Sequence, residues 1–248
     1  MPIEPILIDN NGVRLSAALY LPEGSGGRLP YPAVIICHGL ASSKESHAPF
    51  AAFLAGQGFV ALAFDWRGHG ASEGSLDGDI LDDVGAALSY LRARREVDAS
   101  RIAIRGSSLG GYLALLAAAR YTALCAVVAI CPASSEVLAQ VIGNRDFWLG
   151  TDRGRGVHVR LTLPGFLRFL AAHDEARAVV SLAPRPLFLI HGQRDEHVPY
   201  QHSEMLYALA GEPKRLWLLP EAMHRDAQQD PAVHAETVAW LRRVMPET

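Results

Sequence analysis

Short, continuously apolar segments recur along the chain and alternate with segments of helical periodicity. Their residues are apolar at nearly every position, not at alternate ones, and strands of this kind are buried on both faces, as in a parallel sheet covered by helices. An alternating N-terminal hairpin through an Asp-Asn-Asn-Gly turn precedes them. The predicted strands are Pro5–Ile8, 15–19, Ala33–Cys37, Phe59–Phe64, Ile102–Arg105, Cys125–Ile130, Leu187–Ile190 and Leu216–Leu219.

Two segments between and after these strands show the helical pattern clearly. Residues 80–91 place aliphatic side chains on one helical face, and aspartates near their start suit the positive end of a helix dipole. Residues 233–244 carry a similar apolar stripe. Repeated strand–helix units predict an α/β protein with a doubly wound, mostly parallel sheet and right-handed crossovers.

The alternation of strands and helices breaks between Pro132 and Pro184. This stretch contains a Gly/Arg-rich run at 150–156 and a predicted helix at Leu163–His173. Because a structureless loop of about fifty residues is uncommon in a compact domain, we expect a small lid over the C-terminal edge of the sheet, where ligands bind in open α/β folds. The predicted division is a core of residues 1–131 and 185–248 with a lid at 132–184.

The strongest chemical signal is the hexapeptide Gly-Ser-Ser-Leu-Gly-Gly at 106–111. It directly follows a predicted strand and directly precedes the helical run Tyr112–Arg120. A G-x-S-x-G motif in this setting predicts a nucleophile elbow, and its two framing glycines select Ser108 over Ser107. A glycine-rich turn without chemistry is the alternative for the motif alone, and the flanking strand and helix argue against it.

A serine nucleophile needs a base and an acid, which in this kind of fold follow it in the order acid, then histidine. Asp195 comes just after the strand Leu187–Ile190, and His224 comes just after Leu216–Leu219. Both strand ends meet at one edge of the sheet, so we predict the catalytic triad Ser108, Asp195 and His224. Glu196 and Glu136 stay open as alternative acids.

The other histidines after Asp195 suit the role of base less well. His197 is too near Asp195 in sequence to face it across a site, and His202 and His234 fall in helical patterns where we expect surface residues. Taken singly, Asp195 could be a helix N-cap and His224 a solvated loop residue. The correct residue types in the correct order favour the triad.

An oxyanion hole is expected at the end of the strand Ala33–Cys37. The sequence there continues as His38-Gly39-Leu40. The backbone N–H groups of Leu40 and of Leu109, which follows the nucleophile, are the expected donors. We expect His38 itself to be structural.

Composition excludes several other classes of function. The 23 basic and 26 acidic residues give a net charge of −3, which offers no case for nucleic acid or an anionic membrane. No apolar run is long enough for a membrane span, and the N-terminus does not read as a signal peptide. The three cysteines and ten histidines lack metal-ligand spacings. We therefore expect buried reduced thiols, no metal, no cofactor and a cytoplasmic location.

Taken together, these motifs resemble the α/β-hydrolase family over essentially the whole chain. The stretch Asp65–Gly74 is similar to a D-x-R-G-H-G-x-S-x-G pattern frequent in its esterases and lipases, and we interpret it as a shaping element beside the oxyanion loop. Within the family the chain most resembles small bacterial carboxylesterases, including cinnamoyl and feruloyl esterases, through its length, its lid and the segment Leu161–Phe166. It departs from them at Ser107 and Leu109, where they commonly have His and Gln.

The resemblance implies a serine carboxylic-ester hydrolase that forms an acyl-enzyme on small to medium, including aromatic, acyl esters. Phe147, Trp148 and Phe166 of the lid are expected to contact the substrate; alternatively, these aromatic residues form only the lid's own core. The expected partner is a small-molecule ester, and a homodimer is left open.

Other functions stay open beside the esterase. A thioesterase or a small peptidase would use the same triad, and a non-catalytic receptor could share the fold. Haloalkane and epoxide hydrolases of this fold use an aspartate nucleophile, so Ser108 argues against them.

Overall fold

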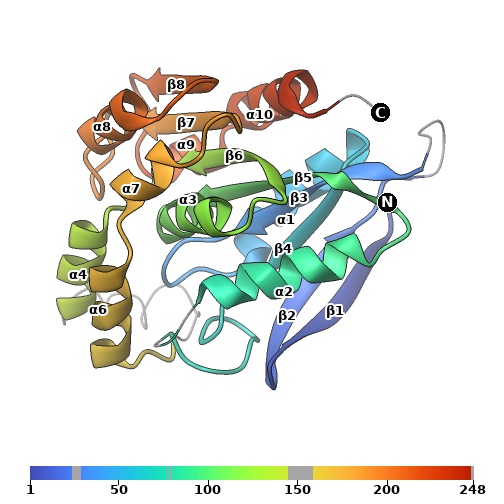
Figure 1. Cartoon of the computed structure of the whole chain (residues 1–248), viewed down its shortest axis with the longest axis horizontal. Helices are drawn as coiled ribbons and strands as arrows, with labels where there is room; N and C mark the ends of the chain where they lie inside the picture. Colours follow the sequence, from blue (N-terminus) through green and yellow to red (C-terminus); the bar gives the residue numbers. More distant parts are fainter. Residues whose placement is uncertain (24–28, 77, 79, 145–158, 247–248) are drawn as a thin grey trace.

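A sheet of eight strands runs through the molecule in the order β1-β2-β4-β3-β5-β6-β7-β8 (Figure 1). The computed structural model describes residues 1–23, 29–76, 78, 80–144 and 159–246. The pairs β1–β2 and β2–β4 are antiparallel, and the other neighbours are parallel. The strands are β1 (Ile3–Asn10), β2 (Val13–Tyr20), β3 (Tyr31–Cys37), β4 (Val60–Phe64), β5 (Val97–Ser107), β6 (Leu124–Ile130), β7 (Leu187–Gly192) and β8 (Lys214–Leu219).

Each predicted strand overlaps an observed one, so the predicted doubly wound sheet is confirmed. The hairpin turn between β1 and β2 also forms where the sequence placed it, with Asn11 and Gly12 at φ +53° and +87°. The helices are α1 (Ala48–Gly56), α2 (Leu81–Arg92), α3 (Leu109–Arg120), α4 (Ser135–Gly143), α6 (Leu163–Ala172), α7 (Glu175–Val180), α8 (Gln201–Leu209), α9 (Asp226–Gln229) and α10 (Pro231–Val244), with a 3-10 turn η1 at Lys44–His47.

Helices cover both faces of the sheet, which explains the continuous hydrophobicity of its strands. Along β3, Ile35 and Cys37 pack in a cluster with side chains of α2 and α3. Val34 and Ile36 point to the other face, where α1 and α10 lie. Because successive side chains alternate between the two faces, a strand buried on both must be apolar throughout.

The segment 132–184 contains three described helices. α4 packs on α6, while α7 packs on α3 and α8 of the core. Two isolated β-bridges, Val159 with His69 and Leu161 with Leu76, join this segment to the loop after β4. The division into core and lid stays a prediction, and the Gly/Arg run at 150–156 lies outside the described residues.

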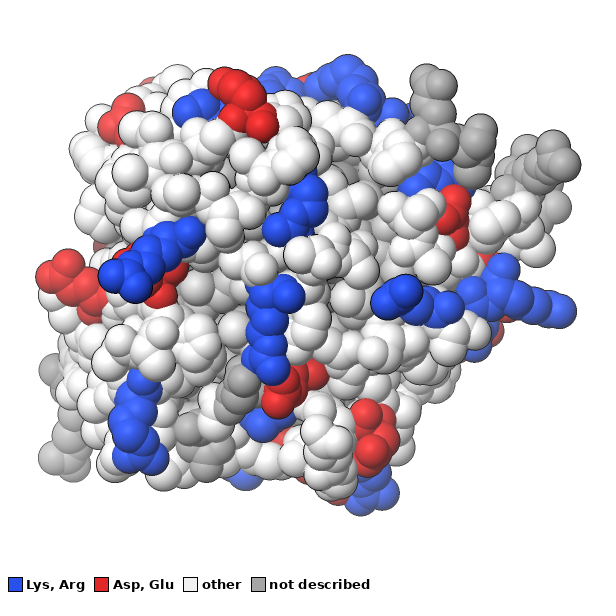
Figure 2. Space-filling view, in the orientation of Figure 1, with Lys and Arg blue, Asp and Glu red and all other residues white. Residues whose placement is uncertain are grey.

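Acidic and basic side chains are interspersed on the face seen in Figure 2, in keeping with the small net charge. Within the described ranges, no helix combines the length and apolar character needed to cross a membrane. The three cysteines are free thiols; Cys37 and Cys131 are buried and Cys125 is half-buried.

Candidate active site

Ser108 occupies a sharp turn between β5 and α3, with φ +56° and ψ −121°. A residue other than glycine rarely adopts such a φ, and the strain is typical of functional positions. Neighbouring backbone atoms leave no room for a side chain at either framing glycine. A Cβ at Gly106 would overlap the Gly110 carbonyl, and a Cβ at Gly110 would overlap the backbone of Cys37. The strand and helix can therefore approach only with glycine at both positions, as the motif predicts.

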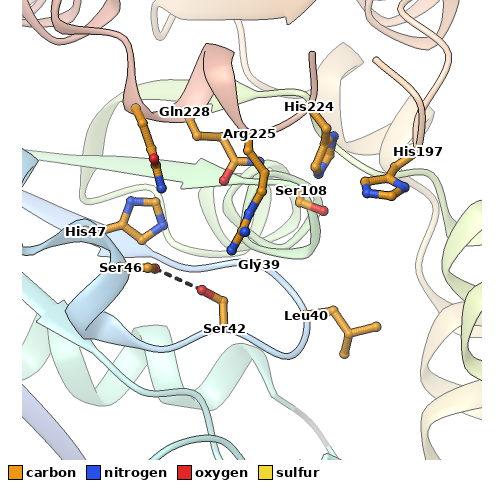
Figure 3. Close-up of a pocket in the computed structure, with 11 residues that line it drawn as sticks. Gly39, Leu40, Ser42, Ser46, His47, Ser108, His197, His224, Arg225 and Gln228 are labelled. Atoms are coloured by element: carbon orange, nitrogen blue, oxygen red, sulfur yellow. Dashed lines mark hydrogen bonds between the residues drawn. The ribbon is translucent and has the colours of Figure 1, made fainter. Parts of the chain in front are cut away.

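Ser107 points away from this turn. Its side chain is buried, and its Oγ lies 3.2 Å from His47 Nε2. Ser108, in contrast, lines two pockets together with His224 (Figure 3). The structure thus places the predicted nucleophile, and not its neighbour, in a cavity.

Asp195 and His224 form a direct pair, with Asp195 Oδ2 2.6 Å from His224 Nδ1. A proton on Nδ1 leaves the lone pair of Nε2 available to accept another. Asp195 Oδ1 accepts from the backbone N–H groups of His197 and Val198, both at 2.8 Å. Burial opposes ionisation of Asp195, but the hydrogen bonds from His191 and His224 outweigh it and hold its pKa well below the usual range.

His191 is a partner of Asp195 that the sequence analysis missed. It is fully buried, and its Nε2 lies 3.1 Å from the Val198 carbonyl and 3.2 Å from Asp195 Oδ2. Because a carbonyl can only accept, Nε2 must carry a proton, and Ser203 Oγ then donates to Nδ1 at 2.7 Å. A polar residue ending the apolar strand β7 was the available signal.

The alternative acids and bases have other partners. Glu196 accepts from the backbone N–H of His224 at 3.2 Å, and Glu136 lies on α4 beside Gln140. His197 packs edge-on against the His224 ring, at 5.2 Å between centroids, and lines both pockets. The sequence does not predict this place of His197 in the pocket wall.

His202 and His234, expected at the surface, are half-buried. The His202 side chain is only 11% exposed, and the His234 ring packs on Phe50 at 4.9 Å between centroids. Burial lowers the pKa of each to about 4. Their helices are amphipathic, but these positions face a neighbouring layer.

The predicted oxyanion loop lies against the nucleophile. A Cβ at Gly39 would come within 3.2 Å of Ser108 Cβ, so a side chain there would crowd the space beside the serine. Leu109 is the first residue of α3, where the N–H has no intrahelical acceptor. Leu40 lines both pockets with Ser108.

His38 holds this loop in place. Its Nε2 accepts from the backbone N–H of Trp66 at 3.2 Å, so Nδ1 carries the proton and donates to the Gly39 carbonyl at 2.8 Å. Trp66 Nε1 donates in turn to the His38 carbonyl at 2.9 Å. Burial lowers the pKa of His38 to about 4, which keeps the ring neutral. These contacts agree with the structural role expected of it.

The Asp65–Gly74 stretch braces the same loop. Asp65 is fully buried and accepts from the backbone N–H of Lys44 at 2.7 Å and from its Nζ at 2.8 Å. Gly70, at φ +49°, leaves no room for a Cβ against the Asp65 carboxylate. The contact explains why this chain has a glycine at position 70.

Two pockets meet at Ser108. One, here called the apolar pocket, has a volume of about 280 Å³; beyond the shared residues it is walled by Ala133, Val137, Leu138, Val141, Glu196 and Val198. The other, the polar pocket, measures about 50 Å³ and is walled by Ser42, Ser46, His47, Arg225, Gln228 and Gln229 (Figure 3). Gly39 also lines the polar pocket.

Of the three predicted substrate contacts, only Phe166 lies among the described residues, and it lines neither pocket. Phe166 is fully buried and stacks on Phe169 at 5.7 Å between centroids, inside the packing of α6. Phe147 and Trp148 lie outside the described residues. In their place, α4 supplies Val137, Leu138 and Val141 to the apolar pocket.

Among the described residues, one group of side chains has metal-ligand proximity: Cys131, Asp195 and His224, with ligand atoms within 4.8 Å of one another. Two of its members are the paired acid and base. Burial raises the pKa of the Cys131 thiol well above its usual value, so the sulfur stays protonated. A neutral thiol is a poor metal ligand, so we interpret Cys131 as packing against the pair.

Comparison with known proteins places the chain in a family of hydrolases. The profile of the prolyl oligopeptidase family matches residues 47–248. The uncharacterized protein YfhR of Escherichia coli is 32% identical over 223 residues, which cover 89% of this chain and 72% of YfhR. The family match spans Ser108, Asp195 and His224.

Solved structures agree with the fold. The esterase domain of a Rhodothermus marinus protein is 25% identical, with a TM-score of 0.76, covering 99% of this chain and 100% of that one. Est1E of Butyrivibrio proteoclasticus, solved with ferulic acid, is 22% identical with a TM-score of 0.80, covering 98% of this chain and 100% of that one. The architecture is the α/β-hydrolase fold.

Proposed function

The chain belongs to the prolyl oligopeptidase family, and from that premise we propose that it is a serine hydrolase that cleaves carboxylic esters through an acyl-enzyme. One observation carries the proposal. Ser108, on a strained elbow, shares a pocket with His224, whose ring is bonded to the ionised Asp195. Nucleophile, base and orienting acid are the parts that acyl transfer needs.

In the proposed reaction, Ser108 Oγ attacks the ester carbonyl carbon and His224 Nε2 takes the serine proton. The backbone N–H groups of Leu40 and Leu109 stabilise the negative charge on the carbonyl oxygen. His224 then protonates the departing alcohol as the carbon–oxygen bond breaks. In deacylation, water gives a proton to His224 and attacks the carbonyl carbon of the acyl-enzyme. The bond to Ser108 then breaks, Ser108 regains its proton from His224, and the carboxylic acid is released. Asp195 stabilises the imidazolium in acylation and in deacylation.

The apolar pocket is the proposed acyl site. Its side chains from α4, together with Ala133 and Val198, offer aliphatic surface beside Ser108. A cavity of about 150 Å³ holds benzene, so about 280 Å³ accommodates a short to medium acyl chain or an aromatic acyl group. Est1E, which shares the fold, was solved with ferulic acid, and cinnamoyl-type esters are therefore included in the proposed class.

A peptidase is the second candidate, because the matching family is named for an oligopeptidase. The triad would attack an amide by the same steps, so the chemistry of the site does not separate the two. The aliphatic side chains of the apolar pocket, Val137, Leu138 and Val141, are the observation that favours an acyl ester as the first candidate.

A substrate panel tests the proposal. It contains p-nitrophenyl esters of rising acyl length, methyl ferulate, an acyl-CoA and a prolyl-p-nitroanilide. We expect the short and aromatic esters to be turned over fastest. Turnover of the anilide above all esters would replace the esterase by the peptidase, and a preference for the acyl-CoA would replace it by a thioesterase.

The nucleophile has a matched control one residue away. Ser108→Ala should reduce hydrolysis to near background, and a fluorophosphonate should label Ser108 in the native protein. Ser107→Ala, which removes only the contact with His47, should retain much of the activity. The reverse pattern would overturn the assignment of the nucleophile.

A further inference from the structure

The polar pocket differs from the apolar pocket in charge as well as polarity. Among the described residues that line it, none is an aspartate or glutamate, whereas Arg225 contributes a guanidinium. The described lining of the apolar pocket includes Glu196 and no arginine or lysine. Glu45, next to the Ser46 wall, is paired with Lys44 at 2.8 Å. An anionic group is therefore favoured in the polar pocket and disfavoured in the other.

Arg225 directly follows His224 and extends into the polar pocket. Figure 3 shows its side chain reaching past the gap between His47 and His224 toward Gly39. Within the described ranges no carboxylate forms an ion pair with it. A guanidinium presents several N–H donors in one plane, which suits two-point recognition of a carboxylate.

A second guanidinium lies behind the pocket wall. Arg105, on β5, is fully buried. Its Nη1 lies 3.1 Å from His47 Nδ1, and its Nη2 donates to the Gln228 carbonyl at 3.0 Å. Its Nε has no hydrogen-bond partner in the described part of the chain. The guanidinium also lies 4.1 Å over the Phe50 ring. No carboxylate among the described residues pairs with Arg105. A buried charge without a counter-ion is costly, and the field of this guanidinium extends into the adjoining pocket.

His47 lies between the buried Arg105 guanidinium and the polar pocket, and it carries no charge itself. Arginine only donates, so His47 Nδ1 must accept from Arg105, and Nε2 then carries the proton toward Ser107 Oγ. Burial, together with the nearby Arg105, lowers the pKa of His47 well below its usual value. His47 is therefore a neutral wall residue, and the positive potential comes from Arg105 and Arg225.

We propose that the polar pocket binds a carboxylate on the alcohol part of the ester substrate, with Arg225 as its direct ligand and Arg105 as a buried source of positive potential. This inference rests on the proposed esterase function. The alcohol side follows because the apolar pocket receives the acyl group and carries Glu196. The small volume of the polar pocket, about 50 Å³, suits a compact anionic group.

Two isosteric esters test the inference: O-butyryl glycolate, which carries the carboxylate on the alcohol, and O-butyryl glycolamide, which does not. The measured quantity is the ratio of their kcat/KM values. We expect the wild-type protein to favour the glycolate ester about tenfold, as for a charge-assisted hydrogen bond. Arg225→Gln should bring the ratio close to one, and Arg225→Lys should retain part of the preference.

The control is Arg95→Gln, which removes one positive charge from a side chain that is 90% exposed and lines neither pocket. Its ratio should equal that of the wild type. Raising the salt concentration should lower the wild-type ratio, because Arg225 is exposed and its field is screened. Monoethyl succinate and ethyl succinamate differ in the same way, carboxylate against carboxamide, but on the acyl side of the ester. The ratio of their kcat/KM values should be the same in the wild type and in Arg225→Gln.

Three results would overturn the inference. The first is a wild-type ratio of kcat/KM for the glycolate over the glycolamide ester of one or less, and the second is the same ratio in Arg225→Gln as in the wild type. The third is a change on Arg225→Gln in the corresponding ratio for the two succinate-derived esters. Turnover of the neutral glycolamide ester distinguishes this failure from failure of the esterase proposal. If the glycolamide ester is cleaved and Ser108 is labelled by a fluorophosphonate, only the carboxylate site falls. If neither ester is cleaved and no label is found, the esterase proposal falls with it.

Discussion

Replacing Asp195 with asparagine tests the triad with the smallest change in shape. In the native protein both carboxylate oxygens accept: Oδ1 from the backbone N–H groups of His197 and Val198, and Oδ2 from the rings of His191 and His224. Asparagine replaces one acceptor by an NH₂ donor. In one orientation the NH₂ group faces the two backbone N–H donors, and in the other it faces the two histidine N–H donors. Neither orientation of the amide therefore preserves all of the hydrogen bonds.

The consequence for catalysis depends on the orientation of the amide. If its oxygen keeps the backbone contacts, the NH₂ group faces His224 Nδ1 and forces the proton onto Nε2, where Ser108 can no longer be deprotonated. General triad behaviour then predicts a loss of kcat on the order of 10⁴, or about 5 kcal/mol of transition-state stabilisation. If the amide turns over, the loop 195–198 loses its acceptor, and the unfolding free energy falls by about 1–3 kcal/mol.

The assay combines p-nitrophenyl butyrate hydrolysis with thermal unfolding of the same samples, so that lost activity is separated from lost fold. Glu196→Gln is the matched control: it makes the same acid-to-amide change one residue away and keeps an oxygen to accept from the His224 N–H. We expect its kcat to change by less than about tenfold. If Asp195→Asn retained most of its activity while Glu196→Gln lost it, the acid would be Glu196.

Three further outcomes follow from the contacts around the site. Gly106→Ala should lower the unfolding free energy by about 3 kcal/mol or prevent folding, since its Cβ would overlap the Gly110 carbonyl; a soluble variant with an unchanged urea midpoint would contradict this. His191→Phe should lower kcat about tenfold to a hundredfold with little change in KM, because it frees Asp195 to move; an effect on KM alone would refute the positioning role. The pKa of His38 is about 4 in the folded chain and about 6.5 in the unfolded chain. Between these pH values the unfolded chain binds more protons, so the unfolding free energy should fall by up to about 3 kcal/mol from this residue as the pH drops from 6.5 to 4. An unchanged urea midpoint between pH 7 and pH 4.5 would argue against this.

The sheet and the elbow could be predicted because their signals are local. A strand buried on both faces must be apolar throughout, and the turn at Ser108 requires glycine on each side within two residues. Asp195 and His224 were found from their places after β7 and β8, since the ends of parallel strands meet at one edge. Chain order then sufficed to pair them.

The residues that the sequence misplaces or does not reveal depend on contacts that no short pattern encodes. Phe166 and the α4 residues Val137 and Leu138 all lie on amphipathic helices, and periodicity does not tell which neighbour an apolar face meets. Phe166 meets Phe169, while α4 lines the apolar pocket. His191 gains its role only from Asp195 and Ser203, which the fold of the loop brings to it.

β1 is an edge strand, and its sequence determines whether a further strand can pair with that edge of the sheet. Pro5 lies in the middle of β1 and pairs with Ala18 of β2, so its nitrogen, which has no hydrogen, must face the open side. A strand from another molecule would meet a missing donor there, beside the charge of Glu4. Although Ile3 and Leu7 are exposed on this strand, an uninterrupted ladder cannot extend across it, and edge-to-edge aggregation is opposed at this end of the sheet.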